Sequence, residues 1–181
     1  MFNRKTMALM LLALTMLGGC YRFSRPEIKD DNLVEVSYQV VNQLILDLRQ
    51  PLPRGSLVVI NSLVNVDDLG QSLPFGRIVS DQISSAFHRS GYQVMGMELP
   101  TEIFAKNEAG ILQLPEKTKE ALNNVGAKAV VIGSFAPGHD NVYVSLRVVE
   151  IASQNVISSA DYSVPMGPDA KALVTKPQTK Q

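Results

Sequence analysis

Segments with helical spacing of apolar residues alternate with short apolar runs along most of this chain, and this alternation restricts the possible folds most. The run Leu57–Ile60 predicts a buried strand that continues to about Leu63, and Ala129–Phe135 predicts another. Between them lie a helical pattern over residues 74–87, a short strand over 92–97 and a second helical pattern over 115–125. Because a helical crossover returns the chain to the same end of a sheet, these strands are predicted to pair in parallel.

The last third of the chain has a different pattern, in which strands follow one another through short turns. Apolar and polar residues alternate over 142–148, and residues 156–164 form a last strand. The turn clusters at 137–141 and 152–155 are too short for a crossover, so two antiparallel hairpins are expected. Near the start, Leu33–Leu48 has helical spacing and is stopped by Pro51 and Pro53. Asp30, Asp31 and Asn32 offer a cap for this helix, and Glu35 follows Asn32 by three residues, as in a capping box.

These patterns predict a single α/β (α+β) domain. Its mixed sheet has βαβ crossovers followed by C-terminal antiparallel hairpins, and its helices pack on the sheet. The expected division of the chain is a signal peptide over 1–19, a tether over 20–30, the domain over 31–165 and a flexible tail over 166–181. The tail is expected because this stretch has two prolines and few apolar residues.

The first twenty residues have the order of a bacterial export signal. Arg4 and Lys5 precede an uncharged apolar run over 7–17, which is too short for a bilayer span of about 20 residues. The stretch Leu17–Cys20 resembles the lipobox of lipoprotein precursors, which implies cleavage before Cys20 and a covalent diacylglycerol and N-acyl lipid on that residue. The alternative is a plain secretory signal with a chance cysteine. Since Tyr21 replaces the aspartate of the sorting pattern, the resemblance favours the outer membrane.

Charge and cysteine content exclude several classes of function. Removal of Arg4 and Lys5 with the signal leaves 15 basic and 17 acidic residues, a net charge of −2. Such a chain lacks the clustered positive charge that phosphate backbones require, so no nucleic-acid partner is expected. With one cysteine and two histidines, neither a transition-metal site nor a disulfide is predicted.

The first crossover places polar side chains near one end of the predicted sheet, where α/β folds commonly bind ligands. A partner-binding role is possible for the following residues: Asn61, Asn65, Asp67, Asp68 and Arg77. The alternative interpretation is structural. Asp67, Asp68 and Ser72 then cap a helix, and Arg77 pairs with a carboxylate such as Asp67 or Asp81.

No enzyme is expected from this sequence. Residues 70–74 approach a nucleophile elbow around Ser72, but the final glycine of the motif is missing. His88 lies over four helical turns from Ser72, about 24 Å along a helix, too far to act as its base. No catalytic residue, metal or soluble cofactor is therefore assigned.

The polar stretch Asn61–Asp68, followed by Phe75–Arg77, resembles the signature of the FlgO family of flagellum-associated outer-membrane proteins. The segments 91–94, 127–133 and 142–144 follow in the order seen in that family, and the resemblance spans about 56–165. It implies a non-catalytic lipoprotein, anchored in the outer membrane, that supports motility beside the flagellar accessory proteins FlgP and FlgT. A homo-oligomeric ring around the basal body is also possible.

Two other functions fit the same anchor and fold class. The chain could be a periplasmic outer-membrane lipoprotein that binds and regulates a cell-wall synthase or a secretion pore. A hydrolase that uses Ser72 is the third hypothesis, and it has the weakest support because the motif is incomplete.

Overall fold

A computed structural model describes residues 27–70, 73–100, 103 and 114–175. The expected signal peptide over 1–19, Cys20 and most of the tether expected over 20–30 lie outside these described residues, as do Ser72 and the end of the expected tail. Every helix in the described part of the chain is too short or too polar to cross a lipid bilayer.

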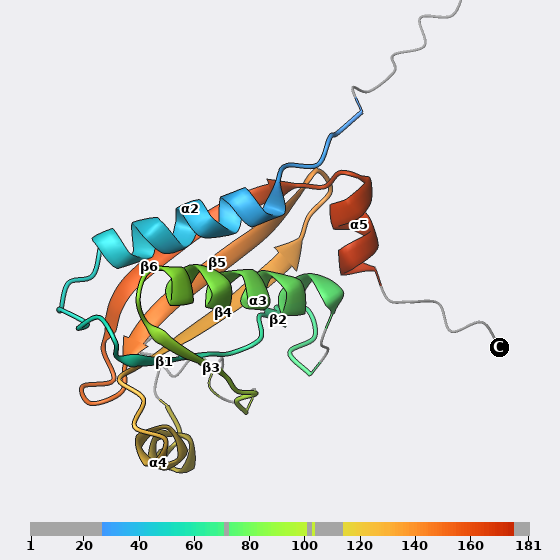
Figure 1. The fold of residues 1–181 in the computed structure, drawn as a ribbon. Helices are drawn as coiled ribbons and strands as arrows, with labels where there is room; N and C mark the ends of the chain where they lie inside the picture. Colours follow the sequence, from blue (N-terminus) through green and yellow to red (C-terminus); the bar gives the residue numbers. More distant parts are fainter. Residues whose placement is uncertain (1–26, 71–72, 101–102, 104–113, 176–181) are drawn as a thin grey trace, which may run out of the picture.

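The described domain is built on one mixed sheet of six strands (Figure 1). Neighbouring strands follow the order β3-β1-β4-β5-β6. The short strand β2 pairs with a later part of β4 than β1 does, at Ser134 and Phe135. The strands comprise β1 (Leu57–Ile60), β2 (Val64–Asn65), β3 (Gln93–Gly96), β4 (Ala129–Pro137), β5 (Asn141–Glu150) and β6 (Val156–Pro165). Pairing is parallel for β3-β1-β4 and antiparallel for β4-β5-β6, which confirms the predicted crossovers and hairpins.

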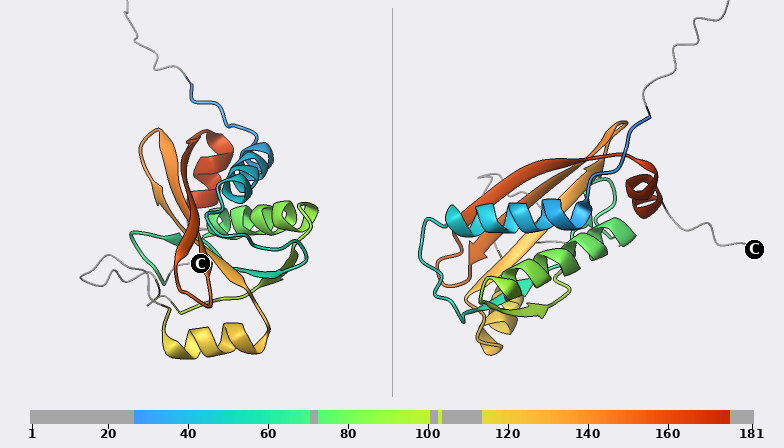
Figure 2. Two further views of the ribbon diagram at one scale, coloured as in Figure 1. Left: turned by 90° about the vertical axis from the view of Figure 1, so that its left-hand side faces the viewer. Right: turned by 45° about the horizontal axis from the view of Figure 1, so that its top comes forward.

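Two long helices cover one face of this sheet, and a shorter helix covers part of the other (Figure 2). The first pair is α2 (Leu33–Leu46) and α3 (Pro74–Arg89), which enclose the larger apolar core with β1, β4, β5 and β6. A second cluster lies under α4 (Glu116–Asn124), against Val59, Val130 and Ile132. Among the described residues, the rest of this second face carries no helix.

Local signals in the sequence account for the ends of the two long helices. The Oδ1 atom of Asn32 accepts a hydrogen bond from the Glu35 backbone N–H at 3.3 Å, so of the three candidate caps it is Asn32 that caps α2. Gly91, just beyond α3, has φ of +88°, a conformation that glycine adopts without the strain of a Cβ atom. The helix α2 ends at Leu46, slightly earlier than the expected Leu48.

The prediction of a flexible tail over 166–181 is wrong for the first part of that stretch, because Pro168–Val174 form the helix α5. Asp30, in the predicted tether, explains why. Its two carboxylate oxygens accept hydrogen bonds from the backbone N–H groups of Asp169 and Ala170, both at 2.9 Å. These bonds cap a short helix from 139 and 140 residues away, so no local pattern could show them. Ala170 is buried, and α5 therefore closes one end of the core (Figure 1).

Removal of this cap is expected to loosen α5 without unfolding the domain. Asp30→Ala leaves two helix N–H groups without their acceptor, which costs about 1 kcal/mol. The amides of Asp169 and Ala170 should then exchange with solvent about fivefold faster, as measured by hydrogen exchange. Asp31→Ala is the matched control, since Asp31 is exposed and should leave exchange in α5 unchanged. Equal exchange in both variants would contradict the capping role of Asp30.

Candidate partner-binding surface

Asn61, at the end of β1, is part of the framework and is only 2% exposed. Its Oδ1 atom accepts a hydrogen bond from the Leu99 backbone N–H at 2.9 Å, and its Nδ2 atom donates to the Ser62 carbonyl at 3.1 Å. Both ends of the amide are therefore bonded to the chain itself. Asn61 joins β1 to the segment after β3 and does not face solvent.

Asn65 is also buried, and it shapes the turn that follows β2. Its Oδ1 atom accepts from the Asp67 backbone N–H at 3.1 Å, while its carbonyl accepts from the Asp68 N–H at 3.3 Å. Asparagine is common in this kind of turn because its side-chain oxygen can accept a backbone N–H bond in place of a carbonyl oxygen. The turn leaves Val66, Asp67 and Asp68 exposed.

Arg77 is exposed on the first turns of α3, and the structure does not give it the expected carboxylate partner. Among the described residues, no ion pair joins Arg77 to Asp67 or Asp81. The predicted side-chain cap of α3 is likewise not formed by Asp67 or Asp68, because the N-cap residue is Leu73 and makes no side-chain bond. The charged groups Asp67, Asp68 and Arg77 thus remain available at the surface.

The close packing of α3 against the connection between β1 and β2 was not predicted from the sequence. The Ser80 hydroxyl oxygen accepts from the Leu63 backbone N–H at 2.9 Å and donates to the Gly76 carbonyl at 2.8 Å. Gly76 lies so close to the strand connection that a Cβ atom there would come within 2.2 Å of the Leu63 carbonyl oxygen. The polar stretch and the following Phe75–Arg77 therefore belong to one packed joint between β1, β2 and α3.

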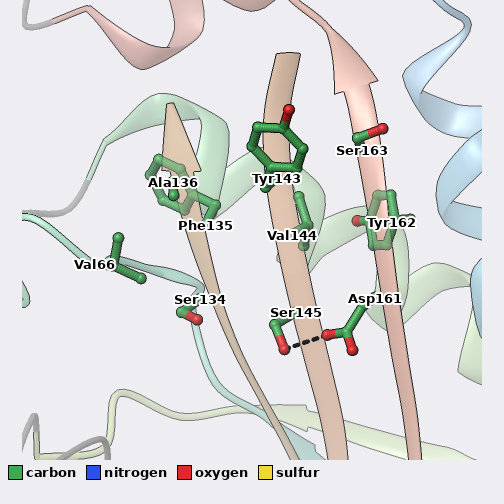
Figure 3. A pocket seen from close by; sticks show the side chains of 10 residues that line it. All are labelled: Val66, Ser134, Phe135, Ala136, Tyr143, Val144, Ser145, Asp161, Tyr162 and Ser163. Atoms are coloured by element: carbon green, nitrogen blue, oxygen red, sulfur yellow. Dashed lines mark hydrogen bonds between the residues drawn. The ribbon is translucent and has the colours of Figure 1, made fainter. Parts of the chain in front are cut away.

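We call the part of the second sheet face that no described helix covers the open face. It contains a hollow of about 430 Å³ beside the exposed turn Val66–Asp68 (Figure 3). Val66, Tyr143 and Asp161 stand on its walls, and Tyr143 is 57% exposed. The Ser145 hydroxyl donates to the Asp161 carboxylate across β5 and β6. The alternation of polar residues along β5 and β6 could have predicted that this face of the sheet is exposed to solvent. It could not have predicted the hollow.

Nothing among the described residues of this surface has the geometry of a catalytic or metal centre. Burial raises the pKa of the Tyr162 phenol above its ordinary value, so this group, which packs against the larger core on the helix-covered face, stays neutral. In the part of the chain that the structure describes, no group of three His, Cys, Asp or Glu side chains could hold a metal ion. Ser72, the candidate nucleophile, lies outside the described residues.

The FlgO protein family model matches residues 38–169, which is most of the chain. The chain belongs to the FlgO family. In this FlgO-family chain the matched region begins within α2 and ends within α5, so it includes all six strands and the five candidate partner-binding residues, but not Cys20. Comparison with curated protein sequences finds no match.

Solved structures similar to this FlgO-family chain include the LpoB C-terminal domains of Salmonella enterica and Escherichia coli. Identity is 16% in both cases, with TM-scores of 0.53 and 0.52. Each comparison covers 74% of this chain and 98% of the LpoB domain. The Escherichia coli LpoB structure determined by NMR is similar at a TM-score of 0.50 and 15% identity, over 78% of this chain and 71% of that one. At this identity the likeness establishes the fold alone.

Proposed function

We propose that this chain is a non-catalytic, lipid-anchored outer-membrane protein that serves as a structural or assembly component of the flagellum and is needed for motility. The family match over residues 38–169 carries the proposal. The lipid anchor on Cys20 comes from the sequence, in which a basic start, a short apolar run and small residues precede the cysteine. The proposed partners are the outer membrane, flagellar accessory proteins such as FlgP and FlgT, and further copies of the chain in a ring.

The surface supports a binding role better than a chemical one. The exposed turn Val66–Asp68 and the hollow beside it combine carboxylates, hydroxyls and an exposed aromatic ring. Such a mixture is common where one protein rests on another, because an aromatic side chain supplies contact area and the polar groups fix orientation. Asp67, Asp68 and Arg77 are therefore the proposed contact residues, while Asn61 and Asn65 hold the turn in place.

The proposal is tested in the source bacterium by deleting the gene and restoring a tagged copy. Deletion is expected to reduce swimming sharply while filaments are still made, and isolated basal bodies should lose density at the outer membrane. The tagged copy should restore both the swimming and the density, and imaging of the tag should place it at that density.

Two results would contradict the proposal. One is normal swimming with unchanged outer-membrane density in the deletion strain. The other is co-purification of the tagged chain with a cell-wall synthase or a secretion pore but with no flagellar body, which favours the alternative function. A tagged chain with Ser72→Ala serves as the control for hydrolysis and should restore swimming fully, because no catalytic role is assigned to Ser72.

A further inference from the structure

The strand β6 forms one edge of the sheet, and its outer side offers main-chain groups for pairing. One residue beyond the two strands, the Met166 N–H donates to the Asp140 carbonyl at 2.8 Å, which makes this a hydrogen-bonded pair and fixes the alternation along β5 and β6. In an antiparallel ladder such pairs alternate, so the N–H and C=O groups of Ser159, Asp161 and Ser163 point away from β5. The side chains of Asp161 and Ser163 lie on the open face of the sheet (Figure 3). Ser159 is exposed, and its position two residues before Asp161 in the strand places its side chain on the same face.

This free edge has defined limits. At its beginning, the Arg49 N–H already donates to the Ile157 carbonyl at 2.9 Å, so the connection after α2 occupies the first outward carbonyl. At its end stands Pro165, which has no N–H group. Between these limits, no backbone group of the described residues bonds to the outward groups of Ser159, Asp161 or Ser163. An unpaired stretch of this kind is a template for another strand.

The charge at the centre of the edge argues against pairing with a second copy. If two copies pair antiparallel about a two-fold axis, the full edge is used only when the axis passes through Asp161. The two Asp161 carboxylates then lie directly opposite one another, which is destabilising. A shift of the axis by one residue in one direction places Ser163 opposite Ile157, whose carbonyl is already bonded to Arg49. A shift in the other direction places Ser159 opposite Pro165, which has no N–H group. Either shift loses hydrogen bonds, so the edge suits a different chain.

The residues around the edge indicate which side chains a strand from another protein would need in order to pair with β6. On the open face, Asp161 is exposed and lies between two small serines, which leaves room for a long basic side chain opposite its carboxylate. On the helix-covered face, Ala160 and Tyr162 are only half-buried, as is Val36 of α2. Because neighbouring residues of a strand point to opposite faces, apolar residues would flank the basic one in sequence.

We infer that the outer edge of β6 binds an extended segment of a different protein, which adds to the sheet as a further strand. The segment carries Lys or Arg opposite Asp161 and an apolar residue on either side of it. Main-chain hydrogen bonds to Ser159, Asp161 and Ser163 supply the attachment, and the carboxylate supplies the selectivity. This inference does not depend on the flagellar role, since it follows from the edge alone.

The test uses the full lipidated chain in detergent micelles and two short synthetic peptides. One peptide has the central order valine-lysine-valine between threonines, and the other has glutamate in place of the lysine. Amide hydrogen exchange read by NMR should show fast exchange at Ser159, Asp161 and Ser163 in the free chain and slow exchange at Ala160 and Tyr162. The lysine peptide should slow the first three amides and bind about fivefold more tightly than the glutamate peptide.

Three variants establish whether the peptides bind at this edge. Asp161→Lys should reverse the preference toward the glutamate peptide, whereas Asp81→Lys makes the same charge change on α3 and should leave it unchanged. Ser159→Pro removes an outward N–H without touching the ladder to β5, so it should weaken both peptides equally. Three results would overturn the inference: the three amides exchange slowly in the free chain, neither peptide protects them, or both peptides bind with equal affinity to the native chain.

Discussion

Replacing Cys20 by Ser is expected to abolish membrane anchoring of the mature chain. Lipid attachment at this position needs the sulfur, because a thiolate is a far stronger nucleophile than a serine hydroxyl. Each acyl chain contributes about 0.8 kcal/mol per buried methylene, and two or more chains give stable anchoring. Nearly all of the native chain should therefore sediment with the outer membrane. The variant should instead be found as an unprocessed precursor held by its signal or as an untethered domain.

The measurement is fractionation of cells, followed by mass spectrometry of the N-terminal peptide. The double variant Cys20→Ser with Ser24→Cys is a sharp control, because it keeps one cysteine in the same segment but moves it away from the small residues at 18 and 19. It should behave like Cys20→Ser. If Cys20→Ser still fractionates with the outer membrane as a mature protein, the anchor does not depend on this residue. A plain secretory signal, the alternative considered for this segment, would then be favoured.

The fold was largely predictable because its main elements bury continuous or alternating apolar patterns. The run Ala129–Phe135 and the alternation over 142–148 became β4 and β5, and the helical spacing over 74–87 became α3. The misses share a different cause, which is that their stabilising contacts are far away in sequence. The helix α5 depends on Asp30, and β2 is two residues long and exists only through its pairing with β4. Neither contact leaves a periodic pattern.

The candidate site was harder to predict, because polar residues in a loop can bond the chain or face a partner with the same local sequence. Asn61 and Asp67 lie within the same short stretch, yet Asn61 is buried against Leu99 and Asp67 is exposed. The sequence identified both as candidates and could not separate them. Only the position of the segment after β3, 38 residues away, shows that Asn61 is committed to the framework.

Gly76→Ala is expected to destabilise the domain strongly, although the same change at an exposed helix position is stabilising. Alanine in a helix is favoured over glycine by about 1 kcal/mol. At Gly76, however, the new Cβ atom would lie 2.2 Å from the Leu63 carbonyl oxygen and 3.0 Å from the Phe135 ring. The carbonyl belongs to the backbone, and its residue is also held by Ser80, so α3 must shift away from the sheet. Overpacking of this kind costs about 3 kcal/mol, which leaves a net loss of about 2 kcal/mol.

Urea and thermal unfolding of the two purified chains measure this difference, and a loss of about 2 kcal/mol should lower the Tm by roughly 8 °C in a domain of this size. The matched control is Gly96→Ala in β3, where a Cβ atom would meet nothing within 4 Å. That variant should unfold within about 0.5 kcal/mol of the native chain. If Gly76→Ala is as stable as Gly96→Ala, the joint between β1 and α3 is not packed as described. If it is destabilised as expected, the glycine of the Phe75–Arg77 stretch is required by the close approach of α3 to Leu63 and needs no contact with a partner.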